Sequence, residues 1–464
     1  MIYYCYVKRR KEKDTNLKGD IEKSSTDHQM PEVTNDANST EMETMIGTNR
    51  TELVLERQMS KMNEYGTDGS DMTLEWQTST IKEGDPSKIN EDTFLNDQAT
   101  LLPYTGKCEI DRTKFEVNQL LGGGQFGSVF EGITNDLVHP EQRIKVAIKV
   151  VNNPLDVSQL NILMSEIKIL DKLDVHLNLV NMIGACTTQL KEGKLWLLLE
   201  YCPQSDLKRF LLKNREAILH DLKPKTTSDE FERVFIKWGH GIAKGLEYLF
   251  SKRIMHGDLA ARNILIGMHG ETENRYVVKI TDFGLSRAFY ECSTYTKQDR
   301  EKIPWKWMDI YFLETGTFTM NSDVWSFGIL LWEMFSLGRS PYAGANARDT
   351  ISEINSGYRL PVPVEISQVK LLAKIYKEVV NKFLLLDPKK RWTFTDLVDY
   401  FEAYLTPEEK DDYKRLEEKY IEMQNTITAK QTSNQAKHQI RYLNSHMHTS
   451  HKIQFNFARS DVAK

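Results

Sequence analysis

The chain has 464 residues, and its 61 basic and 66 acidic side chains give a formal net charge of −5. This length allows about two to three domains, and the nearly balanced charge provides no strong field that would favour nucleic acid as a partner. The five cysteines are odd in number and far apart, which argues against a disulfide framework and indicates a reducing compartment. No apolar run approaches about 18 residues, so we expect no membrane span.

The first hundred residues are dominated by small polar and charged side chains. Such a composition buries too little apolar surface to offset the entropy lost on ordering, so residues 14–100 are expected to be mostly disordered. A short aromatic stretch is followed by a basic cluster, which consists of Lys8, Arg9, Arg10, Lys11 and Lys13. Two interpretations stay open: a solvated basic segment, or a segment that contacts anionic lipid at the inner face of a membrane.

A glycine-rich loop follows an alternating apolar segment that begins at Phe115. Gly122, Gly124 and Gly127 fit the pattern G-x-G-x-x-G, which a dinucleotide-binding turn shares. Here an alternating strand pattern resumes at Ser128, so we expect the loop to close a hairpin rather than to open a helix. Glycines would let backbone N–H groups approach phosphate oxygens with no Cβ in the way.

Lys149 lies inside an apolar strand pattern over residues 145–151. A lysine in a central strand is costly unless it has a partner, whereas a lysine on an edge strand can face solvent. A helical pattern over 160–170 places Glu166 at the border of an apolar face, from which it could reach a neighbouring strand. A carboxylate that orients a lysine toward nucleotide phosphates is a pairing that phosphoryl transfer uses.

Three further side chains point to the same chemistry. Asp258 and Asn263 are separated by five positions in a loop, and Asp282 follows an apolar strand pattern over 277–281. A carboxylate near a substrate hydroxyl, with an amide oxygen and a second carboxylate on Mg²⁺, is an arrangement suited to phosphoryl transfer.

These motifs, in this order, resemble those of a protein kinase domain over residues 114–405. The resemblance implies a bilobal α+β fold, with a small antiparallel β lobe and one key helix over 114–200, and a larger, mostly helical lobe over 203–405. It also implies ATP and Mg²⁺, or Mn²⁺, as cofactors, with Asp258 as the catalytic base and with Asn263 and Asp282 as metal ligands.

The same resemblance implies a set of residues in contact with the nucleotide. Lys149 would hold the α- and β-phosphates and be oriented by Glu166, and the backbone after the apolar strand would bind adenine. The implied nucleotide contacts are Leu121, Gly122, Gly124, Gly127, Val129, Ala147, Lys149, Glu200 and Cys202.

The catalytic loop resembles that of tyrosine kinases. Arg262 follows Asp258 by four positions, and Ala260 stands where serine/threonine kinases usually have lysine. Residues 303–308 resemble a substrate-binding loop that accommodates tyrosine. Asp323 is implied to hydrogen-bond the backbone of the catalytic loop.

Finer features resemble the cytoplasmic part of receptor tyrosine kinases of the fibroblast, vascular-endothelial and platelet-derived growth factor receptor group. The resemblance implies that residues 1–100 are a juxtamembrane-like segment, and that the chain is cytoplasmic, at or near the plasma membrane. It further implies autophosphorylation at Tyr290 and Tyr295, homodimers, and adaptors that bind phosphotyrosine. Plain surface tyrosines are the alternative at both positions.

Two departures from the family pattern favour an alternative, a pseudokinase scaffold that binds partners without phosphoryl transfer. Gly257 replaces the usual arginine before Asp258, and Tyr311 replaces a glutamate that would pair with Arg391. An unpaired buried arginine would cost about 3–5 kcal/mol, so we expect Asp309 or Glu314 to pair with it, or Arg391 to reach solvent.

The last segment, 406–464, is expected to contain a charged, solvated helix over 406–425 and then a flexible tail. Within the helix, residues 420–423 read Tyr-Ile-Glu-Met, which resembles a phosphotyrosine docking site. The plain alternative is a surface tyrosine in a charged helix.

Overall fold

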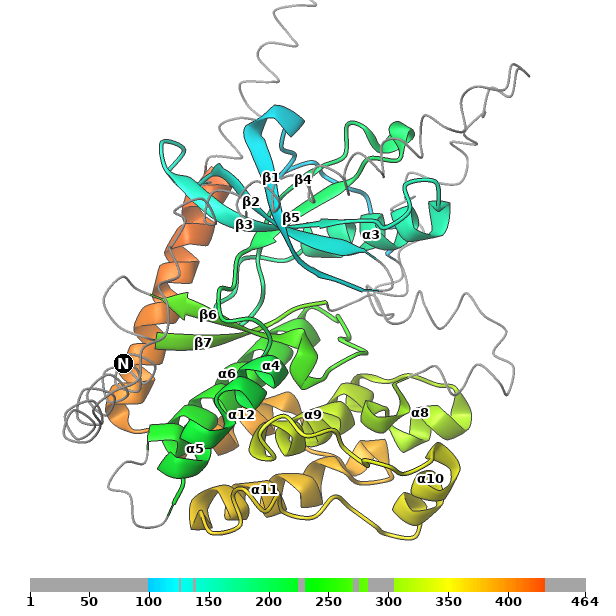
Figure 1. Cartoon of the computed structure of the whole chain (residues 1–464), viewed down its shortest axis with the longest axis vertical. Helices are drawn as coiled ribbons and strands as arrows, with labels where there is room; N and C mark the ends of the chain where they lie inside the picture. The colour runs from blue at the N-terminus through cyan, green and yellow to red at the C-terminus, as the bar shows by residue number, and fades with distance from the viewer. Residues whose placement is uncertain are drawn as a thin grey trace, which may run out of the picture.

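The computed structural model describes residues 99–124, 127–136, 139–223, 230–269, 275–282 and 304–429. Figure 1 shows a lobe built on a β-sheet above a lobe built mainly of helices. The expectations for the basic cluster, for Tyr290 and Tyr295, and for the tail beyond residue 429 lie outside the described residues. Ala99 and Thr100, at the end of the stretch expected to be disordered, form a turn, and the Thr100 carbonyl accepts a hydrogen bond from Lys168 at 3.1 Å.

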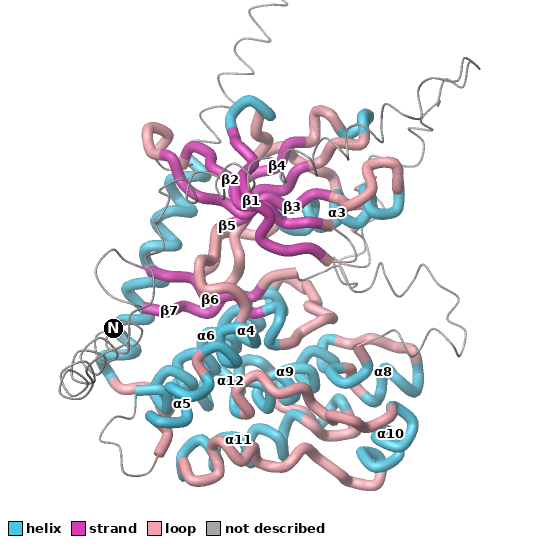
Figure 2. The backbone as a smooth tube through the Cα atoms, in the orientation of Figure 1, coloured by secondary structure: helices cyan, strands magenta, loops and turns pink. Residues whose placement is uncertain are grey.

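Within the described residues, the small lobe contains a five-stranded antiparallel sheet in the order β1-β2-β3-β5-β4. Figure 2 shows these strands gathered above the helical lobe. Its strands are β1 (Phe115–Gly123), β2 (Ser128–Asn135), β3 (Arg143–Val150), β4 (Met182–Cys186) and β5 (Trp196–Glu200). Because side chains alternate along a strand, the two faces of the sheet pack against different partners. Val146, Ile148 and Leu198 form a small core on one face, whereas Leu197 and Leu199 belong to a large cluster on the other.

One helix, α3 (Val157–Leu170), contributes more buried residues to the large cluster than any other element described in the small lobe. The Asp156 carboxylate accepts hydrogen bonds from the backbone N–H groups of Ser158 and Gln159, which caps the helix N-terminus. The predicted helix over 160–170 is therefore confirmed, and it begins three residues earlier than the pattern indicates.

The large lobe joins the small lobe through the segment after β5. Its helices are α4 (Leu207–Lys213), α5 (Arg215–Asp221), α6 (Glu230–Ser251), α8 (Ile310–Thr315), α9 (Met320–Phe335), α10 (Ala347–Asn355), α11 (Lys370–Phe383) and α12 (Phe394–Glu402). A hairpin of β6 (Ile264–His269) and β7 (Arg275–Ile280) lies next to the small lobe (Figure 1).

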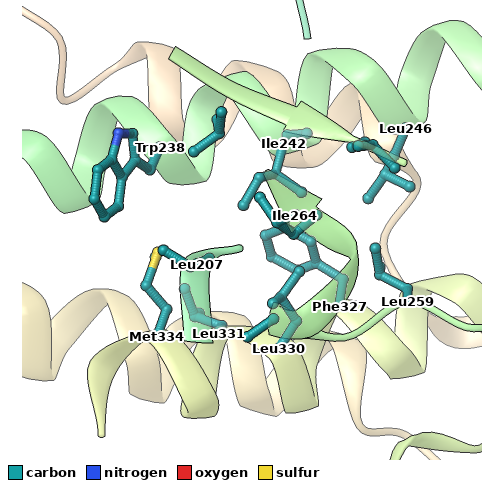
Figure 3. Packing of buried hydrophobic residues seen from close by; sticks show 14 of the residues in the cluster. Leu207, Trp238, Ile242, Leu246, Leu259, Ile264, Phe327, Leu330, Leu331 and Met334 are labelled. Carbon is teal, nitrogen blue, oxygen red and sulfur yellow. The ribbon is translucent and has the colours of Figure 1, made fainter. Parts of the chain in front are cut away.

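The core of the large lobe forms between α6 and α9. Figure 3 shows Ile242 of α6, Ile264 of β6 and Phe327 of α9 close together in this core. On α6, Trp238, Ile242 and Leu246 recur every four residues, so they share one face of the helix and are almost completely buried. This core fixes the hairpin relative to the helices, and with it the polar residues that precede β6 and follow β7.

The structure departs from the prediction in the segment after α12. A helix spans residues 407–429, so it is longer than expected. The prediction that this helix is solvated is wrong for one of its faces, because the hydroxyls of Tyr413 and Tyr420 hydrogen-bond to residues of the kinase-like region. Tyr413, Leu416 and Tyr420 recur at helical spacing, a signal that the many Glu and Lys residues obscure. None of the helices in the described ranges is both long and apolar enough to cross a lipid bilayer.

Candidate active site

The glycine-rich loop closes the hairpin between β1 and β2, as predicted. Gly122 pairs with Val129 and Gly123 with Ser128, and the Gly124 N–H donates to the Gly127 carbonyl at 2.8 Å. A Cβ at position 127 would lie 2.3 Å from the Val150 carbonyl oxygen, so the close approach of β3 excludes a side chain there. Among described residues, no heavy atom lies within 4 Å of a Cβ built on Gly122 or Gly124, so this part of the loop faces space that ligand atoms could occupy.

Lys149 lies between two carboxylates. Its Nζ atom is 3.0 Å from the Glu166 carboxylate and 2.6 Å from Asp282 Oδ1. Since β3 pairs with both β2 and β5, Lys149 is not on an edge strand, and that alternative is wrong. The contact with Glu166 that the helix pattern predicts is confirmed.

In this cluster one lysine faces two carboxylates, and burial and charge act on the three groups in opposite directions. Burial opposes the charge on Lys149, but Asp282 and Glu166 together raise the pKa of the lysine above its usual value. Desolvation also opposes the charge on Asp282, yet Lys149 lowers the pKa of that carboxyl. Burial outweighs the lysine at Glu166 and raises the pKa of its carboxyl. With the side chain of Asp282 43% exposed, the cluster can accept a cation or a cation–phosphate complex from solvent.

Asp323 of α9 hydrogen-bonds to the backbone of the loop that carries Asp258. The Asp323 carboxylate accepts the backbone N–H groups of His256 at 2.6 Å and of Gly257 at 2.8 Å, as the resemblance implies. His256 Nδ1 accepts the Asp258 N–H at 3.2 Å, and Nε2 lies 3.1 Å from the Thr281 carbonyl, so Nε2 carries the proton in this arrangement. Gly257 has a φ of +73°, a left-handed conformation that glycine adopts without strain.

The two carboxylate oxygens of Asp258 are each fixed by a neighbour. Arg262 donates to Oδ1 at 2.5 Å, and the Asn263 side-chain amide donates to Oδ2 at 2.9 Å. Arg262 in turn lies over the ring of Trp307, 4.6 Å from its centroid. Both carboxylate oxygens of Asp258 therefore accept a hydrogen bond from within the same loop, which holds the side chain in one orientation.

Glu333 of α9 is a residue that the sequence reasoning missed. Its Oε2 atom accepts the backbone N–H of Ala261 at 2.9 Å and the indole N–H of Trp307 at 2.7 Å, so it joins the loop that carries Asp258 to the segment around Trp307. Burial raises the pKa of the Glu333 carboxyl. A glutamate inside the apolar run of α9 was the available signal, since a buried carboxyl needs such partners.

The β6–β7 hairpin brings the expected metal ligands together. Ile264 pairs with Ile280, and the Thr281 N–H donates to the Asn263 carbonyl at 3.0 Å, so Asn263 is next to the residue that precedes Asp282. Both amide hydrogens of Asn263 are directed to Asp258, so its side-chain oxygen is the atom that could bind a cation. One carboxylate and one amide oxygen fit Mg²⁺, which takes its other ligands from water and phosphate.

The segment expected to bind adenine begins at Glu200, the last residue of β5. The sheet register places Val129 opposite Lys149 and Ala147 opposite Leu199, so part of the implied nucleotide-binding set lies on adjacent strands. Burial raises the pKa of the Cys202 thiol to about 12, so this thiol is neutral. Contact between these residues and a nucleotide stays a prediction.

Arg391 has a partner, although the family glutamate is replaced by Tyr311. Asp309 accepts two hydrogen bonds from its guanidinium, at 2.7 and 2.8 Å, and both side chains are completely buried. Of the three arrangements considered, pairing with Asp309 is therefore the one observed. Glu314 instead accepts from Asn355 at 2.6 Å, and Tyr311 is 36% exposed.

Comparisons with known proteins agree with this geometry. The family model for protein tyrosine and serine/threonine kinases matches residues 115–401, and the chain belongs to that family. Platelet-derived growth factor receptor alpha of Xenopus laevis is 31% identical over 68% of this chain and 35% of the receptor. Vascular endothelial growth factor receptor 3 of Danio rerio is 33% identical over 66% of the chain and 24% of the receptor.

A third relative, fibroblast growth factor receptor 1 of Xenopus laevis, is 32% identical over 67% of this chain and 37% of the receptor. The predicted resemblance to this group of receptor tyrosine kinases is thus confirmed. The chain spans about a third or less of the length of these curated relatives.

Proposed function

We propose that this chain is a receptor-type protein tyrosine kinase that transfers the γ-phosphate of ATP to a tyrosine hydroxyl, including its own Tyr290 and Tyr295. The observation that carries the proposal is the assembled cluster around Lys149, which lies within 3.0 Å of both Glu166 and Asp282. In this arrangement the lysine is held where it could neutralise nucleotide phosphates.

Asp258 would act as the general base. Its carboxylate, fixed by Arg262 and Asn263, would accept the proton of the tyrosine hydroxyl as that oxygen attacks the γ-phosphorus and ADP leaves. Lys149 and the backbone of the glycine-rich loop would offset the phosphate charge. Mg²⁺ held by Asn263 and Asp282 would supply further charge neutralisation.

Preference for tyrosine is supported by the catalytic loop and by the relatives. Ala260 stands where serine/threonine kinases usually have lysine, and Arg262 lies between Asp258 and the ring of Trp307. All three relatives described above are named as growth factor receptors. Homodimers, phosphotyrosine-binding adaptors, and a place at the inner face of the plasma membrane with contact through the basic cluster at 8–13 are part of the proposal.

A pseudokinase scaffold is the second candidate. The observation that favours it is Gly257, which offers no guanidinium to pair with a phosphorylated loop. The second departure from the family pattern, Tyr311, supports this candidate less, because Asp309 gives Arg391 a buried partner in place of the missing glutamate.

The test is to incubate the full chain with ATP, Mg²⁺ and a tyrosine-containing polymer, and to identify the phosphorylated amino acid by mass spectrometry. We expect phosphotyrosine in the polymer and on the chain, and almost none with Asp258→Asn. Nucleotide binding without any transfer would support the scaffold, and phosphoserine or phosphothreonine alone would show the opposite specificity.

A further inference from the structure

The helix over residues 407–429, hereafter the bridging helix, contacts both sides of the junction between the lobes. In Figure 1 it is the orange helix that runs from the helical lobe past β7 and β6 toward the sheet. Near its start, Glu409 accepts from Arg233 of α6. Further along, Tyr413 donates to Asn178 Oδ1 at 2.6 Å, and Gln424 accepts the Val175 N–H at 2.8 Å.

Tyr420 is the residue of this helix that reaches the segment between the lobes. Its hydroxyl lies 3.2 Å from Glu200 Oε1 and accepts a hydrogen bond from Lys279 Nζ at 2.9 Å. Lys279 Nζ is also 3.0 Å from Glu200 Oε1 and lies over the Tyr420 ring, 4.6 Å from its centroid. The three groups therefore form a closed triangle in which each contacts the other two.

This triangle joins three separate parts of the chain. Glu200 ends β5 and begins the connection to the large lobe, and its other oxygen accepts from the Asn181 amide at 2.8 Å. Lys279 lies on β7, three residues before Asp282, and only 3% of its side chain is exposed. The Glu200 carboxylate is therefore held at both oxygens, and it belongs to the residue whose backbone enters the connection.

The chemistry of the triangle requires the tyrosine hydroxyl. Burial raises the pKa of Tyr420 to about 12, so the hydroxyl stays protonated and can donate to Glu200 while it accepts from Lys279. Burial opposes the charge of Lys279, but Glu200 and Tyr420 raise the pKa of that lysine above its usual value. A phenylalanine would keep the ring contact and would remove both hydrogen bonds, so that the buried Lys279 ammonium and the partly exposed Glu200 carboxylate would each lose one partner.

We propose that Tyr420 is a positioning residue for nucleotide binding, which acts by fixing the Glu200 carboxylate and thereby the backbone that enters the connection between the lobes. The inference rests on the proposed function in one respect, namely that the ligand of this segment is ATP. The bridging helix would thus contribute to nucleotide binding, although it is far in sequence from the segment that begins at Glu200. It also means that adaptor binding at Tyr420 would require this part of the helix to leave the domain.

The test compares Tyr420→Phe with Tyr413→Phe in the full chain. Both changes remove one hydroxyl from the same helix, but Tyr413 contacts Asn178 and not Glu200. We expect Tyr420→Phe to weaken ATP binding about 3- to 10-fold, measured by calorimetry, because the binding segment is less well ordered beforehand. Tyr413→Phe should change ATP affinity less than about 2-fold. Where transfer is measured, Tyr420→Phe should raise the KM for ATP and leave kcat nearly unchanged.

A second measurement separates a local effect from release of the whole helix. Hydrogen exchange at residues 200–204 should speed up in Tyr420→Phe and not in Gln424→Ala, which removes the contact with Val175 N at the same end of the helix. Equal effects of all three variants, or unchanged exchange and affinity in Tyr420→Phe, would overturn the proposal. If the unsubstituted chain forms no phosphotyrosine, but the variants still show the expected differences in ATP affinity and hydrogen exchange, then the proposed transferase activity is rejected and the role of Tyr420 is retained.

Discussion

Two clusters of this molecule each pair a basic side chain with carboxylates, but they differ in the number of carboxylates and in burial. Between the lobes, Lys149 contacts Glu166 and Asp282, so one cation faces two carboxylates. In the large lobe, Arg391 pairs with the single carboxylate of Asp309, and both side chains are 0% exposed. The Arg391 guanidinium also donates to the carbonyls of Leu385 at 2.8 Å and Asn321 at 2.7 Å.

The difference in charge balance and exposure between the two clusters indicates which of them has a structural role and which a functional one. The Arg391 pair is balanced in charge and well supplied with hydrogen bonds, so the loss of one partner would leave an uncompensated buried charge. The Lys149 cluster has two carboxylates for one lysine, and its Asp282 side chain is partly exposed, so this is the cluster at which we propose that a cation binds. Substitutions between the lobes should therefore change activity most, and substitutions at the Arg391 pair should change stability most.

The largest effect on activity is expected from Asp258→Asn. The amide keeps the size of the side chain but cannot accept the substrate proton, so turnover should fall about 10²- to 10⁴-fold. The free energy of unfolding should stay within about 1 kcal/mol of that of the unchanged chain, because the side chain is only partly buried. Steady-state kinetics and urea unfolding on the same preparations check both parts. Turnover within a factor of about 3 of the original would remove Asp258 from the role of base.

Asp309→Ala should reduce stability strongly, in contrast to Asp258→Asn, which should mainly reduce turnover. Removal of one partner leaves the Arg391 charge buried, so the free energy of unfolding should fall by about 3–5 kcal/mol. A matched control is Glu116→Ala, because the Arg143–Glu116 pair has the same 2.7 Å distance but side chains that are 55% and 61% exposed. That change should cost less than about 1 kcal/mol. Similar losses for the two variants in urea unfolding would contradict the assignment of Asp309 as the buried partner.

The smallest effect is expected from replacing Gly257, the residue before Asp258, with alanine. Gly257 and Gly344 have φ values of +73° and +75°, so an alanine at either position should cost about 1 kcal/mol of stability from backbone strain alone. Only Gly257 precedes Asp258, so only Gly257→Ala should also reduce turnover. Thermal unfolding and kinetics of both variants provide the check, and an unchanged stability of Gly257→Ala would show that the loop relaxes around the added methyl group.

The site could be predicted from the sequence wherever the signal was local. The spacing of Gly122, Gly124 and Gly127 before a resumed strand indicated the hairpin, and the helical pattern around Glu166 indicated the partner of Lys149. The partner of Arg391 stayed open among three arrangements, because Asp309 is 82 positions away and no periodic pattern relates the two. Glu333 was missed for a similar reason, since its contacts with Ala261 and Trp307 span 72 and 26 positions.

The sequence by itself determined the class of protein, the elements of the site, and the side chains that could carry phosphoryl transfer, because strand, helix and turn preferences act over a few residues. The tertiary structure alone decided which charges are paired and which surface of the bridging helix is covered. Tyr420 and Glu200 are 220 positions apart, and their contact exists because the packing of β7 against the helix brings them together. Contacts of that separation depend on the shape of the whole domain, which local pattern does not encode.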